Sequence, residues 1–73
     1  MIRLEVDCKL PGRAALRTVE TASGVTAQEL LAILGLTELA GEIIVVYQGA
    51  SVALADRLPA DGKVVLLPVI CGG

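Results

Sequence analysis

The chain has 73 residues, of which 55% are hydrophobic and one, Tyr47, is aromatic, and its net charge at neutral pH is −2. A chain this short forms one domain with a core close to the smallest that is stable, built here from Leu, Ile, Val and Ala. Such a hydrophobic composition argues against disorder. The basic residues are scattered along the chain, so no nucleic-acid-binding stripe is expected.

The residue types also limit the chemistry of this chain. It has no His, which excludes Ser-His and Cys-His catalytic arrangements, and two widely spaced cysteines make a protein-only metal site improbable. The longest apolar run, Val64 to Cys71, is too short to cross a bilayer, and no secretory signal opens the chain. We therefore expect a cytoplasmic protein that is not an enzyme by itself, with no catalytic side chain, no metal and no membrane partner.

The first third of the chain predicts a β-hairpin. Apolar and charged residues alternate over residues 2–8, as in a strand with one buried face. Pro11 and Gly12 favour a tight turn, and residues 14–20 then form a returning strand. Thr26 and Glu29 have capping-box spacing, and the apolar periodicity that follows predicts an amphipathic helix of about ten residues ended by Gly35.

The second half predicts at least two further strands. Residues 42–48 are rich in β-branched residues and too short for a helix, residues 50–54 provide a short edge strand, and residues 56–60 a turn. The apolar run from Lys63 to Ile70 is typical of a central strand, parallel to the first. The expected fold is α+β: a β-grasp domain, residues 1–70, with a mixed four- to five-stranded sheet and one main helix on one face.

The last three residues form a tail, expected to be flexible, after this central strand. Cys71 is followed by Gly72 and Gly73, and glycine has no Cβ, so such a tail fits a narrow channel in a partner protein. The terminal carboxylate of Gly73 is then the group best placed to react. The alternative is a frayed end without a role.

Several motifs resemble ubiquitin-like sulfur carriers of the MoaD/ThiS superfamily over the whole chain. They are Tyr47-Gln48-Gly49, Asp61-Gly62-Lys63-Val64 and the ending from Leu66 to Gly73. The ending looks most like the small subunit of molybdopterin synthase (the MoaD type), and next most like the thiamine-pathway carrier (the ThiS type). The terminal motif is moderately specific, and the fold much less so.

This resemblance implies a carrier mechanism. An adenylating enzyme would use ATP and Mg²⁺ to convert Gly73 to an acyl-adenylate, and sulfur would then produce a C-terminal thiocarboxylate. Cys71 and Gly72 would thread the partner's channel. The sulfur would pass to a pterin precursor of molybdenum or tungsten cofactor in the large subunit of molybdopterin synthase, or to the thiamine thiazole in thiazole synthase. No cofactor is bound.

Strand parity predicts a surface for these partners. If Ile2, Leu4 and Val6 face the helix, alignment with the ubiquitin-like pattern turns Val64 and Leu66 inward with them. An aliphatic face then points outward, and on a small acidic protein such a face indicates docking. In the alternative, a homodimer or a different parity buries these residues. The predicted docking residues are Ile44, Val46, Val65, Leu67 and Val69.

Three readings of the tail and the cysteines stay open. In a ubiquitin-like modifier, which also begins with adenylation, Gly73 would be joined to lysines of target proteins. In a plain β-grasp interaction module, the tail would have no role. Cys8 and Cys71 lie near the same sheet edge if the first and last strands are parallel, so they either form a disulfide on oxidation or stay reduced in the cytosol.

Overall fold

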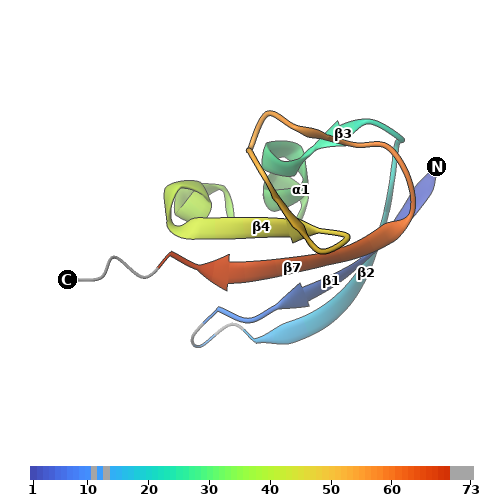
Figure 1. The fold of residues 1–73 in the computed structure, drawn as a ribbon. Helices are drawn as coiled ribbons and strands as arrows, with labels where there is room; N and C mark the ends of the chain where they lie inside the picture. Colours follow the sequence, from blue (N-terminus) through green and yellow to red (C-terminus); the bar gives the residue numbers. More distant parts are fainter. Residues whose placement is uncertain (11, 13, 70–73) are drawn as a thin grey trace.

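The computed structural model describes residues 1–10, 12 and 14–69, and its main feature is a mixed sheet of five strands in the order β2-β1-β7-β4-β5 (Figure 1). Strand β1 pairs with β7 in parallel, and the other neighbouring pairs are antiparallel. The α+β β-grasp prediction is confirmed, including the short edge strand. The strands are β1 (Ile2–Cys8), β2 (Ala15–Thr21), β4 (Ile43–Tyr47), β5 (Ala50–Val52) and β7 (Gly62–Pro68).

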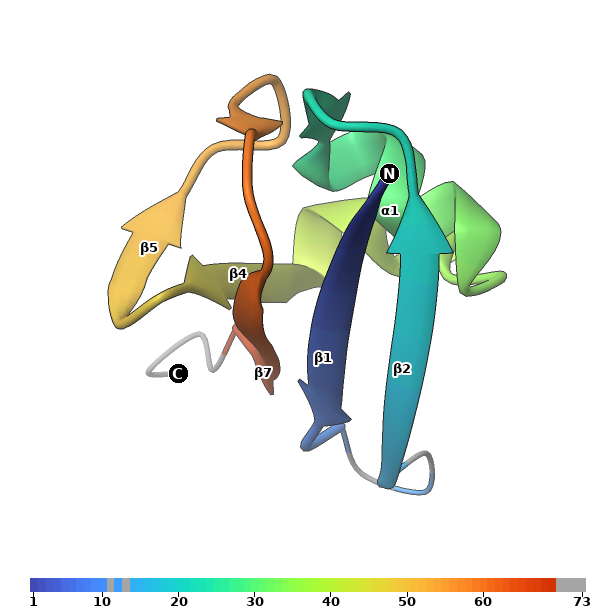
Figure 2. The ribbon, with the colours of Figure 1, turned by 90° about the vertical axis from the view of Figure 1, so that its right-hand side faces the viewer.

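Helix α1 (Ala27–Ile33) covers one face of this sheet, which we call the helix face, and the opposite side is the outer face (Figures 1 and 2). Its Ala27, Leu30 and Leu31 are fully buried, in one hydrophobic core with inward side chains of β1, β4 and β7. Complete burial of one aliphatic side chain contributes about 1.5–3 kcal/mol, so these contacts dominate the stability of the domain. The strand residues in this layer include Leu4, Val6, Val45, Val64 and Leu66.

The ends of α1 are set by local hydrogen bonds. Thr26 and Glu29 form the predicted capping box, in which each side chain accepts a hydrogen bond from the backbone N–H of the other residue. These hydrogen bonds from Thr26 hold the pKa of the exposed Glu29 carboxyl below its usual value. At the other end Leu34 is the C-cap, Gly35 has a φ of 75°, and Leu36 N donates to Leu31 O at 2.8 Å. The helix of seven residues is shorter than predicted because this cap closes it at Ile33.

Two segments differ from the sequence prediction. The expected loop before β4 contains a 3-10 helix, η1 (Thr37–Glu42). The expected turn at residues 56–60 contains strand β6 (Arg57–Leu58), which pairs with β3 (Val25–Thr26) in a small second sheet. Two-residue strands carry no readable periodicity, and the fully buried Leu58 provides the packing that makes this one form.

The turn between β4 and β5 is fastened to the start of β7. Gln48 and Gly49 have φ values of 50° and 84°, and a two-residue turn with positive φ at both positions suits an antiparallel hairpin. Gln48 Nε2 donates to Asp61 O at 2.9 Å, and the Tyr47 hydroxyl donates to Ala60 O. A Cβ at Gly62 would lie 2.6 Å from Gln48 Nε2, so glycine is required there while this contact is kept.

Candidate docking face and carrier tail

The site is built on β7, the central strand of the sheet. Its side chains alternate between the two faces: Val64 and Leu66 are fully buried on the helix face, whereas Val65 and Leu67 are half-buried on the outer face. The parity predicted from sequence is therefore confirmed. Strand β7 therefore carries aliphatic side chains on both faces, one set in the core and the other on the outer surface.

Strand β4 adds its own outward residues beside those of β7. In the antiparallel pairing Ile44 lies opposite Leu67, and Val46 lies opposite Val65. Ile44 is 39% exposed and Val69, just beyond β7, is 41% exposed, so the rim of the patch is more accessible than its middle. We call the contiguous set Ile44, Val46, Val65, Leu67 and Val69 the docking face.

Charged residues of β1 border the docking face on one side. Asp7 lies beside Val65 in the parallel pairing of β1 with β7, and the Asp7 carboxylate is 3.4 Å from the Lys9 ammonium. Glu5 and Lys63 are neighbours in the same pairing one step further along the outer face. The face thus has an aliphatic centre with a charged margin, the layout of a protein interface. Its use in docking stays a prediction.

The last described residue is still attached to the sheet. Val69 N donates a hydrogen bond to Glu42 O at 2.9 Å, which extends the pairing of β7 with β4 by one residue beyond the strand. The predicted carrier residues Cys71, Gly72 and Gly73 lie outside the described residues, as does Ile70. The same holds for the Cys71 partner of the disulfide hypothesis, while Cys8 is buried on the helix face.

Residues 1–10, 12 and 14–69 contain no cluster of three or more His, Cys, Asp or Glu side chains that would hold a metal ion. Among the same residues, no helix is long and apolar enough to cross a membrane.

Sequence reasoning missed two features of this surface. Gln48 was singled out only as part of a motif, yet it joins the β4-β5 turn to Asp61. Leu16 was predicted to lie in the second strand without a side assigned, and it is 79% exposed on the outer face. The cross-strand position of Leu16 opposite Asp7 follows from register, which a single sequence does not define for a hairpin whose turn length is open.

Known proteins resemble this chain in their three-dimensional structure and not in their sequence. No protein-family model matches this chain, and no curated protein sequence matches it. SAMP1 from Haloferax volcanii, described as a small archaeal modifier protein, has a TM-score of 0.70 at 19% identity, with 97% of this chain and 99% of SAMP1 covered.

Two further structures give the same picture. A candidate molybdopterin converting factor, subunit 1, from Pyrococcus furiosus has a TM-score of 0.75 at 13% identity, over 96% of this chain and 100% of the other. A ubiquitin of Caldiarchaeum subterraneum has a TM-score of 0.69 at 15% identity, with 99% of this chain and 98% of the other covered. At these identities the likeness concerns the fold. The chain is a small β-grasp protein with the fold of ubiquitin-like modifiers and MoaD-like carriers.

Proposed function

We propose that this protein is a sulfur carrier whose Gly73 is activated by a partner enzyme and converted to a thiocarboxylate. The observation that carries the proposal is the position of β7: this central strand forms part of the docking face and ends at Pro68, four residues before Gly72 in the sequence. A partner bound on the docking face is then close to the start of the tail. Glycines in the tail allow it to enter a narrow active-site channel.

The chemistry is supplied by partners, and the chain supplies the carboxylate. An adenylating enzyme with ATP and Mg²⁺ joins the Gly73 carboxylate to AMP and releases pyrophosphate. A sulfide donor then attacks the acyl carbon, AMP leaves, and the C-terminal thiocarboxylate remains. Activation is necessary because a carboxylate is a poor electrophile, whereas AMP is a good leaving group. The acyl-adenylate and the thiocarboxylate are thus covalent intermediates of this chain.

For the sulfur acceptor, we propose a pterin precursor of molybdenum or tungsten cofactor, held by the large subunit of a molybdopterin synthase. The Leu66 to Gly73 ending and the fold likeness to the Pyrococcus furiosus protein support this assignment. Delivery to thiazole synthase for thiamine is the alternative within the same chemistry. Incubation of the thiocarboxylate form with each synthase and its precursor separates them by which product forms.

A second candidate function is protein modification. The fold likeness to SAMP1 and to an archaeal ubiquitin favours it, because those proteins are described as a modifier and a ubiquitin. In this case the activated Gly73 is transferred to a lysine amine, and an isopeptide bond replaces the bond to AMP. Linkage-specific mass spectrometry of target lysines detects such conjugates.

The test uses the full chain with an adenylating enzyme from the same genome, ATP, Mg²⁺ and a sulfide donor. We expect an intact mass that corresponds to replacement of one oxygen by sulfur, and no such change in a variant lacking Gly72 and Gly73. The proposal fails if the wild-type carboxylate is never adenylated, or if sulfur is incorporated equally in the shortened variant. Isopeptide conjugates without a thiocarboxylate would instead establish the modifier.

A further inference from the structure

Strand β2 forms one edge of the main sheet and offers unpaired backbone along seven residues. It pairs only with β1, and within the described residues no strand lies along its other side (Figure 2). The opposite edge, β5, has three residues. Long edge strands are sites where an extended peptide adds to a sheet through main-chain hydrogen bonds.

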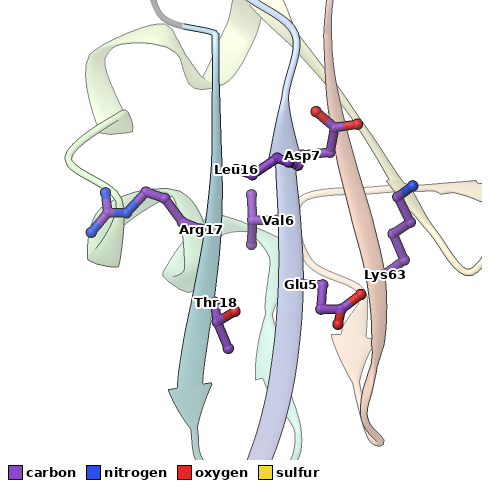
Figure 3. A pocket seen from close by; sticks show the side chains of 7 residues that line it. All are labelled: Glu5, Val6, Asp7, Leu16, Arg17, Thr18 and Lys63. Carbon is purple, nitrogen blue, oxygen red and sulfur yellow. The ribbon is translucent and has the colours of Figure 1, made fainter.

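On the helix face, an apolar cavity of about 170 Å³ opens beside β2. Its walls come from β1, β2 and the segment between α1 and η1, and cavities of about 150 Å³ are large enough to hold benzene. Arg17, exposed on β2, also lines this cavity. Its side chain extends away from β1, off the open edge of β2, as Figure 3 shows in a view of the hollow on the outer face. The lining residues are Val6, Cys8, Ala15, Arg17, Leu34 and Leu36.

On the outer face, the neighbouring residue Leu16 is also apolar and is 79% exposed. It lies opposite Asp7 and lines a wider hollow of about 380 Å³ over β1, together with Thr18 and Lys63 (Figure 3). Three consecutive β2 residues therefore present an apolar cavity on the helix face at Ala15, an apolar side chain on the outer face at Leu16, and a positive charge on the helix face at Arg17.

We propose that β2 binds an extended segment of a partner protein as a sixth strand, and that it selects two consecutive apolar residues next to an acidic one. One apolar side chain fills the cavity beside Ala15, the next covers Leu16, and the carboxylate meets Arg17. The alternation of side chains along the added strand matches the alternation along β2. This interaction is distinct from the carrier chemistry and uses none of the docking-face residues.

Self-pairing of β2 fits these side chains less well. In a symmetric antiparallel pair centred on Thr18, which gives the longest overlap, each Leu16 faces Glu20 of the other copy. A pair centred on Arg17 places two like charges opposite each other, which is destabilising. The charge of β2 therefore favours a segment with an acidic residue over a second copy of this chain.

Two short synthetic peptides probe the proposal, one with the order Val-Val-Asp and one with Asp-Val-Val, each flanked by Ser and Thr. The first order suits a parallel added strand and the second an antiparallel one. Amide chemical shifts of the full chain report binding, and we expect the largest changes in β2 and at Leu34 and Leu36 for one of the two. Changes confined to the docking face or to β5, or no binding of either peptide, would overturn the proposal.

Backbone pairing has a signature that side-chain contact lacks. Successive N–H groups of a strand point to opposite sides, so N-methylation of one Val should abolish binding while N-methylation of the adjacent Val should leave it nearly unchanged. Equal effects at both positions would contradict strand addition. Concentration-dependent dimerisation of the chain alone that competes with the peptide would identify a second copy as the occupant instead.

A charge exchange tests the role of Arg17. We expect Arg17→Glu to weaken binding of the Asp peptide roughly tenfold and to strengthen binding of a matching Lys peptide. Arg3→Glu is the matched control, because Arg3 is an exposed arginine on the outer face of the neighbouring strand β1. Equal weakening by both variants would show a general charge effect and remove Arg17 from the proposal. Thiocarboxylate formation should be unchanged in Arg17→Glu.

Discussion

Leu67→Asp places a charge in the middle of the docking face. Leu67 is half-buried beside Ile44, so its replacement should cost about 1 kcal/mol of folding free energy, roughly half the value for a fully buried Leu. A domain with about 5 kcal/mol of stability stays folded after this loss. In the complex, loss of a central apolar anchor costs about 2 kcal/mol or more, equivalent to roughly a 30-fold weaker association.

The assay is the initial rate of Gly73 adenylation as a function of carrier concentration. We expect kcat/KM to fall roughly 30-fold for Leu67→Asp, with the loss mainly in KM because the tail itself is unchanged. Leu16→Asp is the matched control: it makes the same substitution on the same face of the sheet, two strands away. Wild-type kinetics for a folded Leu67→Asp protein, or an equal loss in Leu16→Asp, would refute the assignment of the docking face.

Three further substitutions test the fold that supports this face. Leu66→Ala should cost about 2–5 kcal/mol in urea unfolding, because Leu66 is fully buried; a smaller cost would mean that the core collapses into the cavity. Gly62→Ala should cost about 1–2 kcal/mol by displacing Gln48, and the combination with Gln48→Ala should recover part of this loss if that contact is the cause. Thr26→Ala should lower stability by about 1 kcal/mol at neutral pH. Folding lowers the pKa of Glu29, so the stabilisation by its carboxylate is present above its unfolded-state pKa and is lost as the pH falls through its folded-state pKa. The stability lost in Thr26→Ala should therefore become smaller in acid. A loss of stability that does not change with pH would contradict this.

Much of the fold could be predicted because several local signals agree. Alternation in residues 2–8 specifies β1, the capping box at Thr26 and the glycine at position 35 specify the two ends of α1, and the apolar run of β7 requires a central position. Elements that depend on distant contacts were missed. Strand β6 forms because Leu58 packs into the core and pairs with Val25, neither of which is visible as a pattern in two residues.

For the candidate site, the sequence predicts to which face of the sheet a side chain points, but it does not predict how exposed that side chain is. The outward direction of Val65 and Leu67 follows from the period of a strand once the inward side is known. The exposed position of Leu16 depends on the β1-β2 register and on the edge position of β2, which emerge only when five strands are ordered. The cavity beside Ala15 likewise requires Leu34 and Leu36, which follow α1, to lie near β2.

The two proposed surfaces suit a carrier that meets successive partners. Under the proposed function, partners that handle the tail would compete for the docking face, because it adjoins the end of β7. The β2 edge is separated from that face by β1, whose outer side is charged, and two strand spacings amount to about 10 Å. A segment bound along β2 leaves Leu67 and Val65 uncovered, so a partner can retain the carrier through β2 while the tail enters another active site. Such a tether would raise the local concentration of the proposed carrier without occupying the surface proposed for its transfer chemistry.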